Sequence, residues 1–380
     1  MELHTLGHDH KKGWSVKSRP RIDSRQTLVV VFGSTSLLDA PGPMNELLEE
    51  YSESVIVGCS TAGEIFGTQI FDESLSAAIA KFEHTNLRVA SAPVRSADDS
   101  FKAGQQIAQQ LKDSTLRGIL VLSDGLSVNG SELVRGLNST MLPSVVVTGG
   151  LAGDGNRFQR TWVLQDRRPQ PGWVTAVGFY GNHVRIGHGS KGGWDLFGPE
   201  RRVTKSKGNV LFELDGRPAL QLYKEYLGDR AAGLPATGLL FPLALRADQS
   251  DSKSLVRTIL AVNEEDQSLT FAGDISEGSL AQLMKANFDR LVQGASEAAT
   301  TTKLSADGES CTLAIAISCV GRRLVLGERT EEETEATLEV LPKGTQQIGF
   351  YSYGEISPYA TGTCDLHNQT MTLTTLSEAA

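Results

Sequence analysis

The chain has 380 residues, of which 39% are hydrophobic and 21% are charged, and its formal net charge is -9. This composition is typical of a globular protein and excludes a disordered one, and the length leaves room for two domains. The acidic balance argues against a chain-wide nucleic-acid surface, although residues 1–24 are locally basic and are expected to form a solvated arm.

No apolar run approaches the roughly 20 residues that a membrane helix needs, and residues 1–12 are too polar for a signal peptide. We therefore expect a cytoplasmic protein without membrane insertion. The cysteines are widely spaced and form no Cys-x-x-Cys motif, which argues against a disulfide framework or a zinc cluster and favours buried, reduced thiols. They are Cys59, Cys311, Cys319 and Cys364.

Residues 27–190 alternate between strand-like and helix-like patterns. Short apolar runs bounded by glycine, aspartate and serine predict strands, and a 3.6-residue spacing predicts helices over 101–111 and 131–137. Because several strands follow one another without a helix, we predict an α/β fold with mixed sheets flanked by helices. The predicted strands are 27–33, 54–60, 75–82, 87–94, 118–122, 144–148, 161–164, 174–180 and 184–188.

A glycine-rich and then basic stretch over 181–208 indicates a domain boundary. We expect two domains, 25–200 and 201–380, after the arm. In the second domain, helical patterns cover 215–228 and 280–294, the latter with Gly294 as its stop, and a further helix begins at Thr330. Strands are expected at 312–319 and 349–353, and a half-exposed strand at 371–376.

Two segments far apart in the chain share one local pattern. An apolar strand runs into Gly-Glu-Ile at 55–65 and again at 349–358, so that Glu64 and Glu355 each follow a buried strand. Small-residue loops also follow predicted strands at 58–67, 123–130 and 149–155. Loops at the carboxyl ends of strands in open α/β sheets are where ligands bind, although the glycines can also serve turns alone. No loop matches a phosphate-binding fingerprint.

Two motifs leave alternatives open. Gly58-Cys59-Ser60-Thr61-Ala62 approximates the nucleophile elbow Gly-x-Ser-x-Gly, which allows a hydrolase with Ser60 or Cys59 as the nucleophile. Asp154 with His188 or His367 could complete its triad, but no spacing supports this arrangement. His188 lies between two glycines, which would let a flat ligand approach its ring, and imidazole is a good axial ligand for a metal.

Ordered motifs over residues 25–376 together resemble the FIST family of sensory proteins. The first half resembles the FIST N-terminal domain through 57–65 and 149–154, with Phe158 and Thr161. The second half resembles the FIST C-terminal domain through several shorter motifs. These are 218–220, Val256-Arg257, 273–278, 318–322, 349–358 and 367–370.

The resemblance implies a ligand-binding sensory module without an output domain of its own. Such a module would regulate a separate sensor histidine kinase or a cyclic-di-GMP enzyme, either a diguanylate cyclase or a phosphodiesterase. Stand-alone members of this layout include the NosP type, which implies haem b as a cofactor, nitric oxide as the signal and His188 as the candidate haem and metal ligand.

Other members imply a small metabolite such as an amino acid, whose carboxylate would meet Arg257 and whose amine would meet Glu64 or Glu355. The sequence leaves open whether the chain forms a homo-oligomer. The full set of candidate ligand-binding residues is Cys59, Ser60, Thr61, Glu64, Gly150, Asp154, Arg257, Tyr353 and Glu355.

Overall fold

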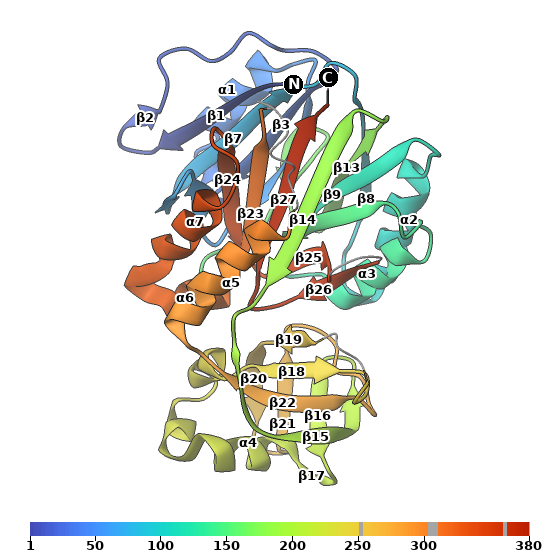
Figure 1. Cartoon of the computed structure of the whole chain (residues 1–380), viewed down its shortest axis with the longest axis vertical. Coiled ribbons are helices and arrows are strands. Elements are labelled where there is room, and N and C mark those ends of the chain that lie inside the picture. The colour runs from blue at the N-terminus through green and yellow to red at the C-terminus, as the bar shows by residue number, and fades with distance from the viewer. Residues whose placement is uncertain (251–253, 303–310, 360–362, 380) are drawn as a thin grey trace.

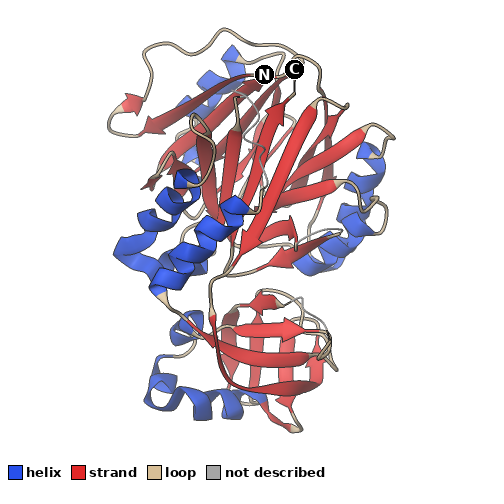
Figure 2. Ribbon diagram, in the orientation of Figure 1, coloured by secondary structure: helices blue, strands red, loops and turns tan. Residues whose placement is uncertain are grey.

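The computed structural model describes residues 1–250, 254–302, 311–359 and 363–379. Figure 1 shows a large α/β body, here called the large lobe, above a smaller β-rich body, here called the small lobe. The small lobe is formed by residues 195–285, between strand β14 and helix α5 of the large lobe. The mixture of helices and mixed sheets agrees with the predicted α/β class (Figure 2).

The large lobe contains three sheets, and its elements are as follows. The strands are β1 (Glu2–Asp9), β2 (Gly13–Trp14), β3 (Thr27–Gly33), β4 (Val55–Ser60), β5 (Glu64–Phe66), β6 (Gln69–Phe71), β7 (Ser74–Lys81), β8 (Asn86–Pro93), β9 (Leu116–Ser123), β10 (Val146–Leu151), β11 (Val163–Gln165), β12 (Arg168–Gln170), β13 (Trp173–Tyr180), β14 (Val184–Lys191), β23 (Leu313–Cys319), β24 (Gln346–Ser352), β25 (Gly354–Pro358), β26 (Cys364–His367) and β27 (Met371–Glu378). The α-helices are α1 (Gly42–Glu50), α2 (Ser100–Leu111), α3 (Gly130–Asn138), α5 (Phe288–Thr300), α6 (Val320–Leu326) and α7 (Thr330–Glu339), with 3-10 turns at Thr35–Leu38, Ala97–Asp99 and Gly327–Arg329.

The three sheets repeat one topology. Their four-strand cores run in the orders β4-β3-β7-β1, β10-β9-β13-β8 and β24-β23-β27-β14. In each core the first pair is parallel and the other two pairs are antiparallel. At least one helix connects the parallel strands, because a parallel pair needs a crossover. The large lobe is therefore a threefold repeat of one β-α-β unit, and the symmetry was not predicted from the sequence.

Each unit passes a short hairpin to a neighbouring sheet. The hairpin β5–β6 pairs with β24, β11–β12 pairs with β4, and β25–β26 pairs with β10. The two Gly-Glu-Ile segments of the sequence begin the first and the third of these hairpins, so they occupy equivalent positions in the repeat. No sheet is complete without a second unit.

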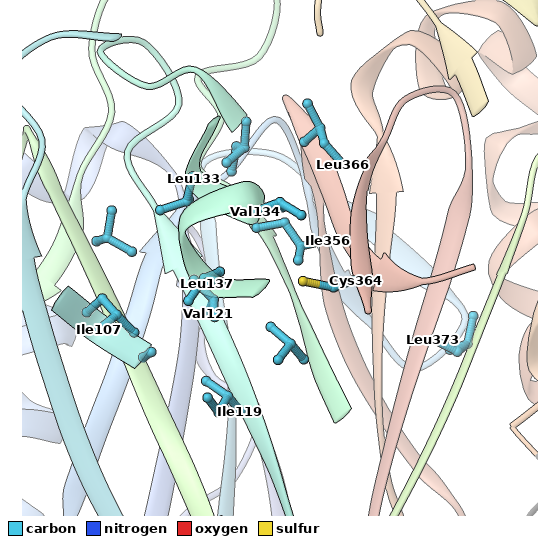
Figure 3. Packing of buried hydrophobic residues seen from close by; sticks show 14 of the residues in the cluster. Ile107, Ile119, Val121, Leu133, Val134, Leu137, Ile356, Cys364, Leu366 and Leu373 are labelled. Atoms are coloured by element: carbon cyan, nitrogen blue, oxygen red, sulfur yellow. The ribbon is translucent and has the colours of Figure 1, made fainter. Parts of the chain in front are cut away.

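Apolar side chains fill the space between the three sheets and beneath the helices. Phe32 and Phe350 come from different sheets and meet in the inner core with their ring centroids 4.6 Å apart. Figure 3 shows part of the outer core, where Ile107 and Leu133 from two helices pack near Val121 of β9. These strands are buried on both faces, which explains their continuous apolar runs.

The small lobe is a twisted antiparallel sheet with one covering helix. Its strand order is β19-β18-β22-β15-β16-β21-β20, and β17 pairs with β16. Its elements are β15 (Asp195–Lys207), β16 (Val210–Leu214), β17 (Arg217–Pro218), α4 (Ala219–Leu227), β18 (Leu243–Arg246), β19 (Leu255–Arg257), β20 (Ile259–Asn263), β21 (Ser268–Phe271) and β22 (Leu280–Lys285), with 3-10 turns at Gly228–Gly233 and Ala236–Leu240.

The predicted helix over 280–294 is wrong. Residues 280–285 form β22 between β15 and β18, and the helix α5 begins only at Phe288 after the side chain of Asn287 caps it. Gly294 lies inside α5, where an added Cβ would approach the backbone of Gly193 to 3.0 Å, so it permits close packing and does not end the helix.

Two further expectations are corrected. The basic segment was expected to be a solvated arm, but residues 2–9 form β1 along the edge of β7 and bury Leu3 and Leu6. The strand β27 was expected to be half-exposed, but it is buried along its length because it lies between β14 and β23. Within the described residues, no helix combines the length and the apolar character that a bilayer crossing requires.

Candidate functional site

A cleft of about 590 Å³ lies between the two lobes. On the large lobe it is lined by the loop that follows β9, by helix α6, which follows β23 directly, and by Tyr353, which follows β24. On the small lobe it is lined by residues of the 233–236, 258–260 and 271–274 segments. The large-lobe wall is formed at the carboxyl ends of parallel strands, the position that the fold class favours for ligands.

The wall at Tyr353 is rigid. Its ring stacks on Phe158 with the centroids 4.4 Å apart, and its hydroxyl accepts a hydrogen bond from the Asp154 N–H and donates one to the Gly155 carbonyl. Burial raises the pKa of Tyr353 to about 12, so the phenol stays neutral. Tyr353 is the one predicted ligand-binding residue that lines the cleft.

The rim of the cleft is apolar. Four large hydrophobic side chains that line it are between 40% and 49% exposed. They are Leu126, Phe158, Leu260 and Leu324. Such a group of exposed apolar side chains marks a surface that is covered by a ligand or a partner.

Glu64 and Glu355 lie in buried, equivalent environments outside the cleft lining. The carboxylate of Glu64 accepts hydrogen bonds from the Thr61 hydroxyl and from the N–H and hydroxyl of Ser74. Glu355 accepts the same set of bonds from Ser352 and Thr370. Burial raises the pKa of Glu64 to about 7 and that of Glu355 to about 8, against the lowering effect of these donors.

These two carboxylates join segments that are distant in sequence. Ser74 begins β7, and Thr370 directly precedes β27, so each glutamate ties the start of a hairpin to the start of the strand that follows it. In this structure the repeated Gly-Glu-Ile motif shapes turns, and neither carboxylate reaches the cleft.

The elbow-like segment is also buried. The Cys59 side chain lies in the inner core, where burial raises the pKa of its thiol, and the Ser60 hydroxyl accepts a hydrogen bond from the Trp162 N–H. Thr61 donates to Glu64. A nucleophile must be within reach of a substrate, and none of these side chains lines the cleft.

Asp154 and Gly150 have structural contacts. Burial alone would raise the pKa of Asp154, but hydrogen bonds from Arg157, from the Thr35 hydroxyl and from two backbone N–H groups hold it below its usual value. Gly150 pairs with Glu355 across β10 and β25. An added Cβ at Gly150 would come within 3.0 Å of Ile317, so the position needs a small residue for packing.

Arg257 bridges the lobes from a buried position. Its guanidinium donates to the carbonyls of Val256 and Asp274 in the small lobe and to that of Leu366 in the large lobe. Burial lowers its pKa to about 10, although nearby carboxylates oppose this effect. Its donors point at backbone oxygens, and it does not line the cleft.

His188 lies elsewhere, in a second cavity of about 690 Å³ beside the connection between the lobes. Gly187 and Gly189 line this cavity together with His188, and helix α5 and the residues that follow it pack against the strand at these glycines. An added Cβ at Gly189 would be 1.9 Å from the Ala298 carbonyl oxygen, and one at Gly187 would be 2.4 Å from that of Thr302. Within the described residues, no three His, Cys, Asp or Glu side chains gather to hold a metal ion.

The sequence indicated the loop 123–130, which contains Asn129, as a place where ligands could bind, but it singled out none of the polar side chains of the cleft. Asn129 and Asp274 contact each other across it, and Thr258 and Asn368 lie in its two walls. The sequence feature that could have pointed to Asn129 and Asn368 is their position, because both belong to polar runs between apolar elements. Nothing in the sequence indicated that the small lobe would face these runs.

The arrangement defines a class of protein, a two-lobed module with a cleft between a scaffold and an inserted domain. The chain belongs to the FIST family. The FIST N domain matches residues 27–217 and the FIST C domain matches residues 219–358. FIST domains are sensory, ligand-binding domains. In space, the second match covers most of the small lobe and the part of the third repeat unit from α5 to β25, whereas β14 of that unit lies in the first match.

Comparisons with individual proteins add no information on function. An uncharacterized protein of Methanocaldococcus jannaschii is 25% identical over 328 residues, which cover 79% of this chain and 60% of that protein. A cyanuric acid hydrolase from A. caulinodans is 12% identical with a TM-score of 0.19, over 78% of this chain and 100% of the other. The PurLQS structure from Thermotoga maritima is 10% identical with a TM-score of 0.18, over 94% and 67%. Neither structural likeness is close enough to support an argument.

Proposed function

We propose that this chain is a small-molecule sensor that binds its ligand in the cleft between the lobes and signals by a change in the position of the small lobe. The observation that carries this proposal is the composition of the cleft, whose two walls come from different lobes. A ligand there contacts both lobes and favours the arrangement in which both contacts are made.

The connection between the lobes suits such a movement. The chain crosses twice, through Gly192 and Gly193 on the way out and through Ala286 and Asn287 on the way back. Gly193 has a φ of +77°, which other residues rarely adopt, so a glycine is needed at this crossing. Hinges consist of a few such loop residues.

The test uses Nile red, a neutral apolar dye whose fluorescence rises on leaving water. We expect saturable binding to the purified chain and its loss in Leu260→Trp/Leu324→Trp, which fills the cleft from its rim. Leu142→Trp is the matched control, because Leu142 is 61% exposed and lies outside the cleft. Equal binding to all three proteins would refute a site in the cleft.

We further propose that a separate cytoplasmic sensor histidine kinase, or a cyclic-di-GMP enzyme, reads the occupancy. The support is membership of a sensory family by a chain whose two matched domains are both FIST domains. A candidate kinase should change its rate of autophosphorylation in the presence of the chain, and Leu260→Trp/Leu324→Trp should change it differently. An identical rate with both proteins would contradict this proposal.

A haem-based nitric oxide sensor is the second candidate, and the cavity at His188 favours it. His188 and His367 line this cavity together with the apolar side chains of Ile186, Val256 and Met284. This lining, to which Gly187 and Gly189 also belong, is compatible with a planar cofactor that has an imidazole ligand. Haem b bound there would supply iron for binding a diatomic gas.

Hemin titration followed by absorption spectroscopy and by thermal denaturation tests this candidate. We expect His188→Ala to abolish both the Soret band and the stabilisation by hemin. His84→Ala, at an exposed position on another strand connection, should change neither. A spectrum in His188→Ala identical to that of the unmodified chain would exclude His188 as the ligand.

A further inference from the structure

The cleft carries a formal charge of one sign. Among the described residues that line it, Asp274 has the only charged side chain. Asp274 is half-buried, and one of its carboxylate oxygens accepts a hydrogen bond of 3.0 Å from the Asn129 side-chain amide. The nearby Arg257 does not line the cleft, and its buried guanidinium donates to three backbone carbonyls.

Two buried polar atoms in the walls lack a hydrogen-bond partner among the described residues. They are Oδ1 of Asn368 in the large lobe and Oγ1 of Thr258 in the small lobe. The Asn368 residue is 0% exposed and the Thr258 residue is 4% exposed. A buried polar atom without a partner is costly, so a ligand that supplies one gains affinity.

The orientation of the Asn368 amide is fixed by its other bond. Its Nδ2 lies 3.0 Å from the carbonyl oxygen of His367. Since a carbonyl can only accept, the amide nitrogen must face it, and the amide oxygen must be the atom left without a partner. Asn368 therefore requires a donor, and a ligand that donates to it and to the hydroxyl of Thr258 would connect the two lobes.

The remaining walls are apolar. Leu126, Leu260 and Leu324 surround the mouth, and Phe158 presents its ring beside Tyr353. A volume of about 590 Å³ suits an organic molecule with one or two rings.

We infer that the ligand of this cleft is an uncharged or singly cationic organic molecule, largely apolar, with at least one N–H or O–H donor directed at Asn368. A ligand with a net negative charge is disfavoured, because Asp274 has the only charged side chain among the described residues that line the cleft. Arg257, Glu64 and Glu355, which would hold an amino acid, do not line the cleft. The inference rests on the proposed function, since it assumes that the cleft is the ligand site.

Competition against Nile red tests the inference with three probes that share one indole ring. Tryptamine is a cation, indole-3-acetamide is neutral and indole-3-acetate is an anion at neutral pH. We expect the first two to displace the dye and indole-3-acetate to be at least about tenfold weaker than tryptamine, because it faces a like charge in a partly desolvated site.

Two substitutions separate the charge from the hydrogen bond. Asp274→Asn keeps an oxygen for Asn129 and should cost tryptamine about tenfold while leaving indole-3-acetamide unchanged. Asn368→Leu should weaken both ligands about tenfold without lowering the melting temperature of the free protein, because it removes an unsatisfied buried oxygen. Asp229→Asn, at an exposed position of the same lobe, should change nothing.

The outcomes distinguish this inference from the proposed function. If Nile red binds regardless of the tryptophans at the rim, the cleft is not the site and both fail. If the dye binds in the cleft but indole-3-acetate displaces it as well as tryptamine, or if none of the probes displaces it, the ligand class is wrong while the site stands.

Discussion

Replacement of Glu355 by glutamine should remove a pH dependence of stability that the wild-type chain has near neutrality. Glu355 is fully buried, and its neighbours include the hydroxyls of Ser352 and Thr370 and the more distant charge of Arg322. Burial raises its pKa from the ordinary 4.5 to about 8. In Glu355→Gln, the amide oxygen can still accept from Thr370, and the amide nitrogen can donate to Ser352.

The direction of the pH dependence of stability follows from the raised pKa of Glu355. The folded protein holds the proton of Glu355 more tightly than the unfolded chain does. The resulting stability is complete below about pH 4.5 and is lost as the pH rises through about 8. One pKa unit corresponds to about 1.36 kcal/mol, so between about pH 5 and about pH 8.5 this residue alone should cost about 4 kcal/mol of the free energy of unfolding.

The assay is urea denaturation of both proteins at several pH values in this range. Other groups titrate equally in both proteins, so the difference in the free energy of unfolding between wild type and Glu355→Gln isolates this residue. As the pH rises, the free energy of unfolding of the variant should increase by about 4 kcal/mol relative to that of the wild type. Glu339→Gln, exposed on α7, is the control and should give a constant difference. A constant difference for Glu355→Gln as well would refute the reasoning.

Three further predictions concern packing. Arg322→Met leaves Glu333 as an unpaired buried charge and should lower the free energy of unfolding by about 3–5 kcal/mol. The double variant Arg322→Met/Glu333→Leu should recover a part of this loss. If it recovers none, the two residues are not coupled. Gly149→Ala would place a Cβ 1.8 Å from a backbone oxygen and should lower the free energy of unfolding, measured by urea denaturation, by about 3 kcal/mol or more. Gly42 lies in open space, so Gly42→Ala should lower it by about 0.5 kcal/mol or less. Equal losses in the two variants would contradict the packing argument. Deletion of residues 1–9 exposes the edge of β7. It should lower the melting temperature and cause the protein to associate, which size-exclusion chromatography would show. An unchanged melting temperature and elution volume would mean that β1 contributes little.

Elements that are buried or amphipathic throughout were the easiest to predict from the sequence. The strands at 27–33 and 184–188 and the helices at 101–111 and 131–137 lie within one residue of, or inside, observed elements. Each combines a continuous pattern with a clear glycine or polar boundary. By contrast, β22 and α5 follow each other with a short connection, and their apolar residues happen to continue one helical period.

The site depends on distant contacts that no local pattern reports. Thr258 and Asn368 meet the same cleft only because the small lobe returns against the strand ends of the large lobe. Glu64 and Glu355 were noticed because of their shared tripeptide, but their burial makes them turn-forming residues with hydroxyl partners. The resemblance found the family correctly, but most of the proposed ligand-binding residues lie outside the lining of the cleft.

The place of β27 has a consequence for biosynthesis. This strand follows both of its neighbours in the sequence, yet it lies inside the sheet, where it separates β14 from β23. Neither the sheet nor the inner core can close until residue 378 has left the ribosome, so the nascent chain must wait with long apolar strands unpaired.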